Sequence, residues 1–308
     1  GGSKTSLEVS DAKFKGLEIE KGDKKDCVFL TRSTNINIVG WEKTRSTLDS
    51  LLKGMRIGTE KLALSEIKEN AAIVCGLAGL SSNSDKIPAI RDIFTSLGFK
   101  NSHIYLSSDI DLAKQLIKEE EGGAILISGT GSICLSKSSQ GEKRVGGYGY
   151  ALGDEGSGFY VGKLALDMAF REEFEKDETF VLTSRICELF NLTSVSQVIK
   201  LFYNHTLKPA DIAKICPLVF EQAYKYHDEC CLKIIDKCAG KLAKLVERTV
   251  KGSTLPNFPI YLLGGVFKNE NAPEFIERIN AKYSYDYGLQ FINISQANIA
   301  LLAIKANQ

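Results

Sequence analysis

The sequence lacks the features that would place it in a membrane, on a nucleic acid or in an oxidising compartment. No apolar run reaches the roughly 20 residues that span a bilayer, and the N-terminus shows no apolar core of a secretory signal. The formal net charge is only +1, so no basic excess points to nucleic acid. The eight cysteines form no C-x-x-C pair and no metal-ligand spacing. These absences predict a cytoplasmic protein with reduced thiols and with neither a nucleic acid nor a membrane as partner.

Two common phosphate-binding fingerprints are also missing. A Walker A loop needs four residues between its glycines and a hydroxyl after its lysine, but Gly158 and Gly162 are separated by three residues and Leu164 follows Lys163. The dinucleotide fingerprint G-x-G-x-x-G fails because Leu152 stands where the third glycine would be. Any nucleotide site must therefore be built differently.

A glycine-rich turn in the middle of the chain is the most informative feature that is present. Apolar runs at Ala124–Ile127 and Ile133–Leu135 flank the turn Ser128–Ser132, which predicts a strand, a tight turn and a second strand. Glycines let backbone N–H groups approach an anion closely, and Thr130 and Ser132 add hydroxyl donors. Taken alone, Gly-Thr-Gly-Ser is equally compatible with an ordinary hairpin turn.

Two further segments follow within a short distance and favour a binding site over a simple turn. Gly146–Gly149 is a second glycine segment, and Gly153–Ser157 opens an apolar, helix-like stretch. Asp154 or Ser157 could cap that helix. Three such segments so close together predict a site built for a ligand.

The rest of the chain alternates between strand-like and helix-like segments, which predicts the α/β class. Further strands are expected at Ser6–Val9, Cys27–Leu30, Ala71–Cys75, Ile104–Leu106, Ile260–Leu263 and Phe291–Ile294, and the clearest helices at Pro88–Leu97, Leu112–Lys118, Ala210–Tyr226, Cys230–Val250, Pro273–Ile279 and 296–306. Asp109 follows one of these strands directly. Open α/β sheets bind ligands at the carboxyl ends of their strands, so this acid is well placed for catalysis. A helix-capping aspartate is the plainer alternative.

Six motifs, taken in order, resemble one family. They are GGSKT at 1–5, Ser33-Thr34-Asn35, Ser108-Asp109, SGTGS at 128–132, GGYGYALGDEGS at 146–157 and LLGGVF at 262–267. Their order and spacing are similar to those of the N-acetylglucosamine kinase group. That group lies within the wider family of BadF/BadG-type ATPases, in the actin-like, ribonuclease-H-like superfamily. The 128–157 block is highly specific, and the resemblance covers nearly the whole chain.

The resemblance implies a fold with two actin-like lobes and with ATP and a sugar in the cleft between them. The first lobe would comprise residues 1–118, joined by a closing helix at 296–308, and the second would comprise residues 119–295. The oligomeric state stays open, with a homodimer as one expectation.

The resemblance also implies roles for particular residues. ATP would be bound by Gly2, Ser3, Thr5, Gly129, Thr130, Gly131, Ser132, Gly264 and Gly265, and the sugar by Asn35, Asp109, Gly147, Tyr148 and Asp154. Asp109 matches the catalytic acid that serves as base. Mg²⁺ would accompany ATP, and its ligands are left open. Tyr148 stands where these kinases commonly have tryptophan, which keeps an aromatic wall.

The expected activity is ATP-dependent phosphorylation of an amino sugar, with the 6-hydroxyl of N-acetylglucosamine as the leading acceptor. Glucosamine, glucose and N-acetylmuramic acid remain alternative acceptors. An ATPase activator that drives electron transfer is an alternative of another class. Such activators hold an iron–sulfur cluster by cysteines, and no suitable cysteine pair adjoins a glycine turn here.

Overall fold

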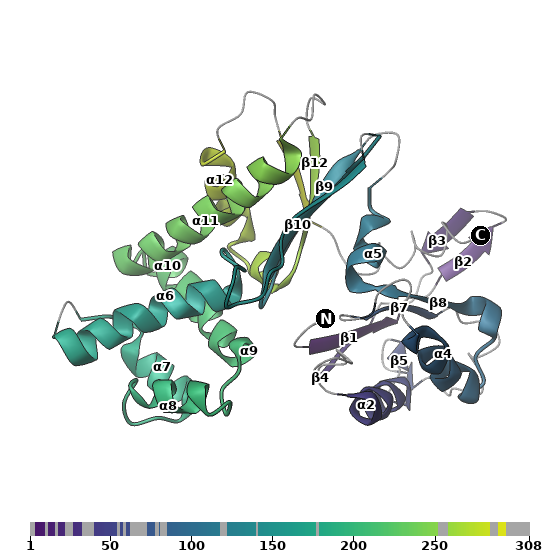
Figure 1. The fold of residues 1–308 in the computed structure, drawn as a ribbon, viewed down its shortest axis with the longest axis horizontal. Helices are drawn as coiled ribbons and strands as arrows, with labels where there is room; N and C mark the ends of the chain where they lie inside the picture. The colour runs from purple at the N-terminus through teal and green to yellow at the C-terminus, as the bar shows by residue number, and fades with distance from the viewer. Residues whose placement is uncertain are drawn as a thin grey trace. The chain divides into compact units, whose positions relative to one another are not determined.

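The computed structural model divides into two compact units, each of which is described separately (Figure 1). Unit 1 comprises Gly1–Leu116 with Ile294–Gln308, and unit 2 comprises Ile117–Asn293. The structure describes residues 4–9, 12–15, 18–21, 27–32, 40–53, 56–57, 60–61, 73–77, 80, 85–117, 122–139, 141–176, 179–251, 258–283 and 289–293. The predicted helix at 296–308 lies outside these residues. The expectation that ATP and a sugar bind between two lobes stays a prediction.

Unit 1 pairs its described strands two by two. The antiparallel pairs are β1 (Lys4–Val9) with β4 (Cys27–Arg32), β2 (Ala12–Lys15) with β3 (Glu18–Lys21), and β5 (Arg56–Ile57) with β6 (Glu60–Lys61). The parallel pair is β7 (Ile73–Leu77) with β8 (Ile104–Ser108). The described helices are α2 (Trp41–Lys53), α4 (Lys86–Ser96) and α5 (Asp109–Lys114), with a 3₁₀ turn at Asn101–His103.

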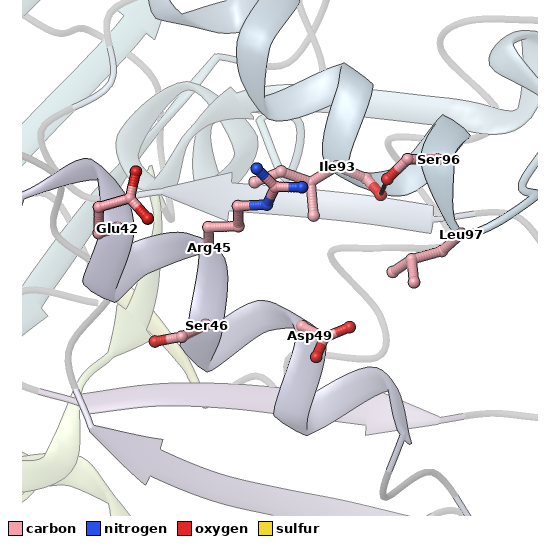
Figure 2. A pocket seen from close by; sticks show the side chains of 7 residues that line it. All are labelled: Glu42, Arg45, Ser46, Asp49, Ile93, Ser96 and Leu97. Carbon is pink, nitrogen blue, oxygen red and sulfur yellow. Dashed lines mark hydrogen bonds between the residues drawn. The ribbon is translucent and has the colours of Figure 1, made fainter.

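Helices α2 and α4 supply much of the core of unit 1. Leu48 and Leu52 from α2 pack in one apolar cluster with Ile90 and Phe94 from α4. At the surface, a groove of about 320 Å³ runs between the two helices, and Figure 2 shows the side chains that line it: Glu42, Arg45, Ser46, Asp49, Ile93, Ser96 and Leu97. None of the predicted site residues lines this groove.

Unit 2 is built on a five-stranded sheet with the strand order β11-β10-β9-β12-β13. The strands are β9 (Gly123–Ser128), β10 (Ser132–Ser138), β11 (Gly141–Gly146), β12 (Phe258–Leu263) and β13 (Leu289–Asn293). The first three pair antiparallel, whereas β12 runs parallel to both β9 and β13. This arrangement brings the end of β12 beside the end of β9, although the two strands lie far apart in the sequence.

The long helix α11 (Glu229–Val250) packs on β9, β10 and β11 and anchors the core of unit 2 (Figure 1). Its residues Ile235, Ala239, Leu242 and Val246 recur at the three- and four-residue spacing of a helix face, and all are buried. The other helices are α6 (Gly158–Phe170), α7 (Thr183–Phe190), α8 (Gln197–Tyr203), α9 (Pro209–Ile212), α10 (Cys216–Lys225) and α12 (Ala272–Ala281). A π-helical turn at Arg171–Glu175 extends α6, and 3₁₀ turns occupy Ala213–Ile215 and Gly265–Lys268.

Most expected elements are present, and three of the differences are informative. The single helix predicted over Ala210–Tyr226 was wrong: α9 ends at Ile212, and α10 starts at Cys216 with a proline in its first turn. The helix predicted at Leu112–Lys118 starts earlier, at Asp109, and ends at Lys114. Strand β11 was not predicted, because its polar residues form no apolar run.

The seven cysteines whose side chains the structure describes are free thiols. Cys134, Cys216, Cys231 and Cys238 are buried. Burial raises the pKa of Cys134 and of Cys216 to about 12, which keeps both protonated at neutral pH. Among the described residues, no helix has the length and apolar character required to cross a membrane.

Candidate active site

The predicted strand–turn–strand around the glycine-rich segment is confirmed in unit 2. Strand β9 ends at Ser128 and β10 begins at Ser132, and these two residues are partners in the strand pairing. The turn between them, Ser128–Ser132, is called the glycine turn below. Within it the Gly129 N–H donates to the Gly131 carbonyl over 2.9 Å, so part of its backbone hydrogen bonding is internal.

The loop Gly153–Ser157, called the acidic loop below, is tied to the glycine turn by two hydroxyl groups. Ser132 Oγ donates to the Glu155 carbonyl over 2.7 Å, and Ser128 Oγ donates to the Gly156 carbonyl over 2.9 Å. Both serine side chains are buried. The two segments that were predicted separately therefore form one hydrogen-bonded structure.

Asp154 lies at the junction of these segments and does not cap the following helix. The cap of α6 is Ser157, whose Oγ accepts from the Tyr160 N–H over 3.2 Å. The Asp154 carboxylate lies against Gly131: a Cβ there would be 2.5 Å from its Oδ2. Burial raises the pKa of Asp154, and hydrogen bonds from the Ser132 and Gly149 N–H groups oppose this rise.

The segment that carries Tyr148 leaves its aromatic ring accessible. Gly147 has a φ of 68° and donates its N–H to the Ser132 carbonyl over 2.8 Å. Tyr148 is 53% exposed, so it is not a core residue. A Cβ at Gly153 would lie 3.2 Å from Tyr148 Cδ2, which places the ring beside the start of the acidic loop.

The turn that follows β12 lies next to the glycine turn. Gly264 has a φ of 108°, and a Cβ there would collide with the Ser128 carbonyl, so only glycine fits. Gly265 differs, because a Cβ there would meet no atom within 4 Å. A Cβ at Gly129 would meet only the Gly265 nitrogen, at 3.8 Å. The packing of unit 2 therefore does not by itself demand glycine at Gly129 or Gly265.

Asp109 lies in unit 1, immediately after β8, as predicted from the sequence. It is the first residue of α5, but the helix cap is Ser108, whose Oγ accepts from the Asp111 N–H over 2.8 Å. The Asp109 side chain makes a local contact in which its Oδ1 accepts from the Ile110 N–H over 3.1 Å. The alternative of a simple capping aspartate is therefore wrong, and Asp109 stays partly exposed.

Other predicted site residues are less well defined. Gly2, Ser3 and Asn35 lie outside the described residues, and Thr5 lies within β1. In the described part of the chain, no three His, Cys, Asp or Glu side chains gather in a way that could hold a metal ion.

Two residues of α11 that sequence reasoning missed also hold the acidic loop. Lys241 Nζ pairs with Glu155 Oε1 at 2.6 Å, and Cys238 Sγ donates to the Gly156 carbonyl over 3.2 Å. Both are more than 80 positions from the loop along the chain, so no local pattern could have revealed them.

Comparison with known proteins identifies the protein family to which this chain belongs. The model of the BadF/BadG/BcrA/BcrD ATPase family matches residues 17–290, and the chain belongs to this family. Its mixed α/β fold is that of the actin-like sugar kinases, as predicted. A candidate N-acetylglucosamine kinase from Chromobacterium violaceum aligns with a TM-score of 0.63 at 20% identity, over 98% of this chain and 95% of that one. A ROK family glucokinase from Streptomyces griseus, solved with glucose and AMPPNP, aligns with a TM-score of 0.54 at 13% identity. That alignment covers 98% of this chain and 95% of the glucokinase chain.

Two curated relatives are closer in sequence. An N-acetylmuramic acid/N-acetylglucosamine kinase from Clostridium acetobutylicum is 31% identical over 99% of this chain and 92% of its own length. An N-acetyl-D-glucosamine kinase from Dictyostelium discoideum is 27% identical over 86% of this chain and 82% of its own.

Proposed function

We propose that this protein transfers the γ-phosphoryl group of ATP to an amino sugar, with the 6-hydroxyl of N-acetylglucosamine as the leading acceptor. The observation that carries the proposal is the 31% identity, over 99% of the chain, to a kinase named for N-acetylmuramic acid and N-acetylglucosamine. The local structure around Asp109 and Asp154 is compatible with this chemistry. A cytoplasmic location and a homodimer are further predictions that belong to this proposal.

Asp109 is proposed as the general base. A sugar hydroxyl is a poor nucleophile, and a carboxylate can accept its proton while the new oxygen–phosphorus bond forms and ADP leaves. Because Ser108 caps α5, the Asp109 carboxylate is not required for that purpose. The hydrogen bond from the Ile110 N–H occupies only part of the acceptor capacity of this carboxylate.

The glycine turn and the turn at Gly264 and Gly265 are proposed to bind ATP. Gly129 and Gly265 approach each other, and neither has a side chain that would hinder a phosphate or an adenosine group. The Gly129 N–H and the Ser132 hydroxyl donate to the carbonyls of Gly131 and Glu155. The family resemblance assigns Thr130 and Gly131 to phosphate contact. Mg²⁺ bound with ATP would offset the charge of the triphosphate. Gly2, Ser3 and Thr5 stay predicted contacts.

Asp154 and Tyr148 are proposed to bind the sugar. An ionised carboxylate only accepts hydrogen bonds, which suits sugar hydroxyls. Two N–H groups already donate to Asp154, and a carboxylate has roughly four acceptor sites in all, so capacity remains for hydroxyls. The exposed ring of Tyr148 can pack against the sugar or its acetyl methyl group. Asn35 and Gly147 complete the predicted set.

N-acetylmuramic acid is the second candidate acceptor, because the Clostridium relative is named for both sugars. It carries a lactyl ether in addition to the acetamido group, so its acceptance depends on space beside the sugar ring.

The proposed function is tested by identifying the phosphorylated sugar formed from each candidate acceptor. Incubation with ATP, Mg²⁺ and N-acetylglucosamine should give a sugar monophosphate with phosphorus coupled to the protons on carbon 6 in the NMR spectrum. N-acetylmuramic acid should be tested in parallel. Absence of a phosphorylated product from every amino sugar supplied would overturn the proposal.

A further inference from the structure

The serine pair, Ser128 and Ser132, holds the acidic loop in place. The two residues are the last of β9 and the first of β10, so they sit opposite each other at the base of the glycine turn. Their hydroxyls donate to consecutive carbonyls of the acidic loop, those of Glu155 and Gly156, over 2.7 and 2.9 Å. Each strand of the hairpin thus contributes one hydrogen bond to the acidic loop.

Because both serine hydroxyls already donate to the acidic loop, neither can donate to ATP at the same time. A serine hydroxyl carries a single proton, so it donates to one acceptor at a time. A hydroxyl that donates to a loop carbonyl cannot also donate to a phosphate oxygen of ATP. Ser132 is one of the predicted ATP-binding residues and Ser128 directly precedes them, yet both hydroxyls donate to the acidic loop.

The acidic loop has a conformation that needs such support. Asp154 has a φ of 57°, in the left-handed region that is uncommon for residues other than glycine. Other hydrogen bonds also act on this loop: the N–H groups of Ser132 and Gly149 donate to the Asp154 carboxylate, and the Gly153 N–H donates to the Gly149 carbonyl over 2.8 Å. The Lys241–Glu155 ion pair is substantially exposed, and the Cys238 thiol is a poor donor. The serine pair supplies the buried hydroxyl groups that hold the backbone of the loop against the base of the glycine turn.

We propose that the serine pair positions Asp154 and thereby sets the affinity for the sugar rather than for ATP, an inference that rests on the proposed amino sugar kinase function. Without either hydroxyl, a loop carbonyl loses a hydrogen bond and the acidic loop populates other conformations. The sugar then binds only the competent fraction, so its apparent affinity falls in proportion. Ser128 and Ser132 are positioning residues in this scheme, because neither touches the sugar.

The test compares Ser132→Ala and Ser128→Ala with the wild-type protein. We expect each variant to raise the KM for N-acetylglucosamine about tenfold, while the KM for ATP and kcat change little. Amide hydrogen exchange in the acidic loop should become faster in both variants. Ser136→Ala is the matched control, because Ser136 lies on β10 away from the turn and should leave both KM values and the exchange unchanged.

The outcomes separate this inference from the function on which it rests. A raised KM for ATP with an unchanged KM for the sugar would show that the hydroxyls contact phosphate, and it would overturn the inference. Unchanged sugar KM and unchanged loop exchange would also overturn it. A wild-type protein that phosphorylates no amino sugar would refute the proposed function instead, and loop exchange would then decide alone whether the serine pair holds the loop.

Discussion

Asp154 has two different expected roles: a sugar contact by family resemblance and a helix cap by local pattern. An aspartate just before a helix would normally be interpreted as its cap. Here Ser157 caps α6, and Asp154 instead lies against Gly131 with the N–H groups of Ser132 and Gly149 as donors. Its left-handed backbone is tolerated because the surrounding hydrogen bonds determine it.

The raised pKa of Asp154 predicts a particular pH dependence of sugar binding. The ionised carboxylate accepts hydrogen bonds from sugar hydroxyls, so binding of N-acetylglucosamine should weaken as the pH falls through this pKa, which burial raises above its ordinary value. The contribution of Asp154 to folding stability should have the opposite pH dependence and decrease as the pH rises. A carboxyl group whose folded-state pKa is raised contributes stability below its ordinary pKa, and this contribution is lost as the pH rises through the raised value.

Calorimetric titration with N-acetylglucosamine between about pH 4 and 8 measures this effect. Asp154→Asn provides the comparison, because it should bind weakly and lose the pH dependence attributed to Asp154. The same pH dependence in wild type and Asp154→Asn would contradict the assignment.

Asp109→Asn should lower kcat by about 10²–10⁴-fold, because it keeps the size of the side chain but removes the proton acceptor. Steady-state kinetics at saturating ATP and sugar measure this loss. Asp111→Asn is a suitable control, since Asp111 lies in the same first turn of α5 and pairs with Lys114 at 3.4 Å. Near-normal turnover of Asp109→Asn would exclude Asp109 as the base.

At the scale of elements, each of the two turns in unit 2 contains glycines of two kinds. Gly264 and Gly131 are demanded by neighbouring atoms of the protein, namely the Ser128 carbonyl and the Asp154 carboxylate. Gly129 and Gly265 have no close neighbour that would exclude a side chain. The second kind is the better probe of a ligand, because substitution there leaves the protein packing largely intact.

Gly265→Val should therefore weaken ATP binding roughly tenfold through steric interference, while the protein stays folded. Calorimetry with ATP and a thermal melt check both parts. Gly240→Ala is the control: Gly240 lies within α11, where a Cβ meets only Lys282 Cδ at 3.5 Å, so the variant should be equally or more stable with unchanged ATP affinity. Gly131→Val is less informative, because its side chain would displace Asp154 and impair sugar binding as well.

Unchanged ATP affinity in Gly265→Val would remove this turn from the nucleotide site.

Some of the strands and helices could be predicted from the sequence and others could not. Strands β9 and β12 were predictable because buried central strands are continuous apolar runs. Strand β11 was missed because four of its residues are exposed and polar or glycine. The helix predicted over 210–226 is interrupted because Pro217 favours the start of a helix rather than its interior.

The segments of the candidate site in unit 2 could be recognised in the sequence, but the hydrogen bonds that join them could not. Glycine turns and acids can be recognised in the chain, and the family resemblance assigned them roles. The hydrogen bonds from the serine pair and from Cys238 depend on how β9, β10 and α11 pack, and that packing is decided by tertiary contacts. Sequence alone therefore predicted which segments matter but not how the acidic loop is held.

At the scale of the whole molecule, the family and the fold are established and the substrate is the claim to be tested. The chain belongs to an ATPase family with an actin-like sugar kinase fold, and its curated relatives include kinases named for amino sugars. A site that hydrogen-bonds the acetamido group should penalise a sugar that lacks it, because each buried polar group left unpaired costs about 1–3 kcal/mol.

The most direct test is ADP release measured over a panel of N-acetylglucosamine, N-acetylmuramic acid, glucosamine and glucose, with Asp109→Asn as the inactive reference. We expect the highest kcat/KM for an N-acetylated amino sugar and, for glucose, a value lower by roughly 5- to 150-fold, which corresponds to one unpaired polar group. Equal kcat/KM for glucose and N-acetylglucosamine, or ADP release that no sugar stimulates, would contradict this expectation.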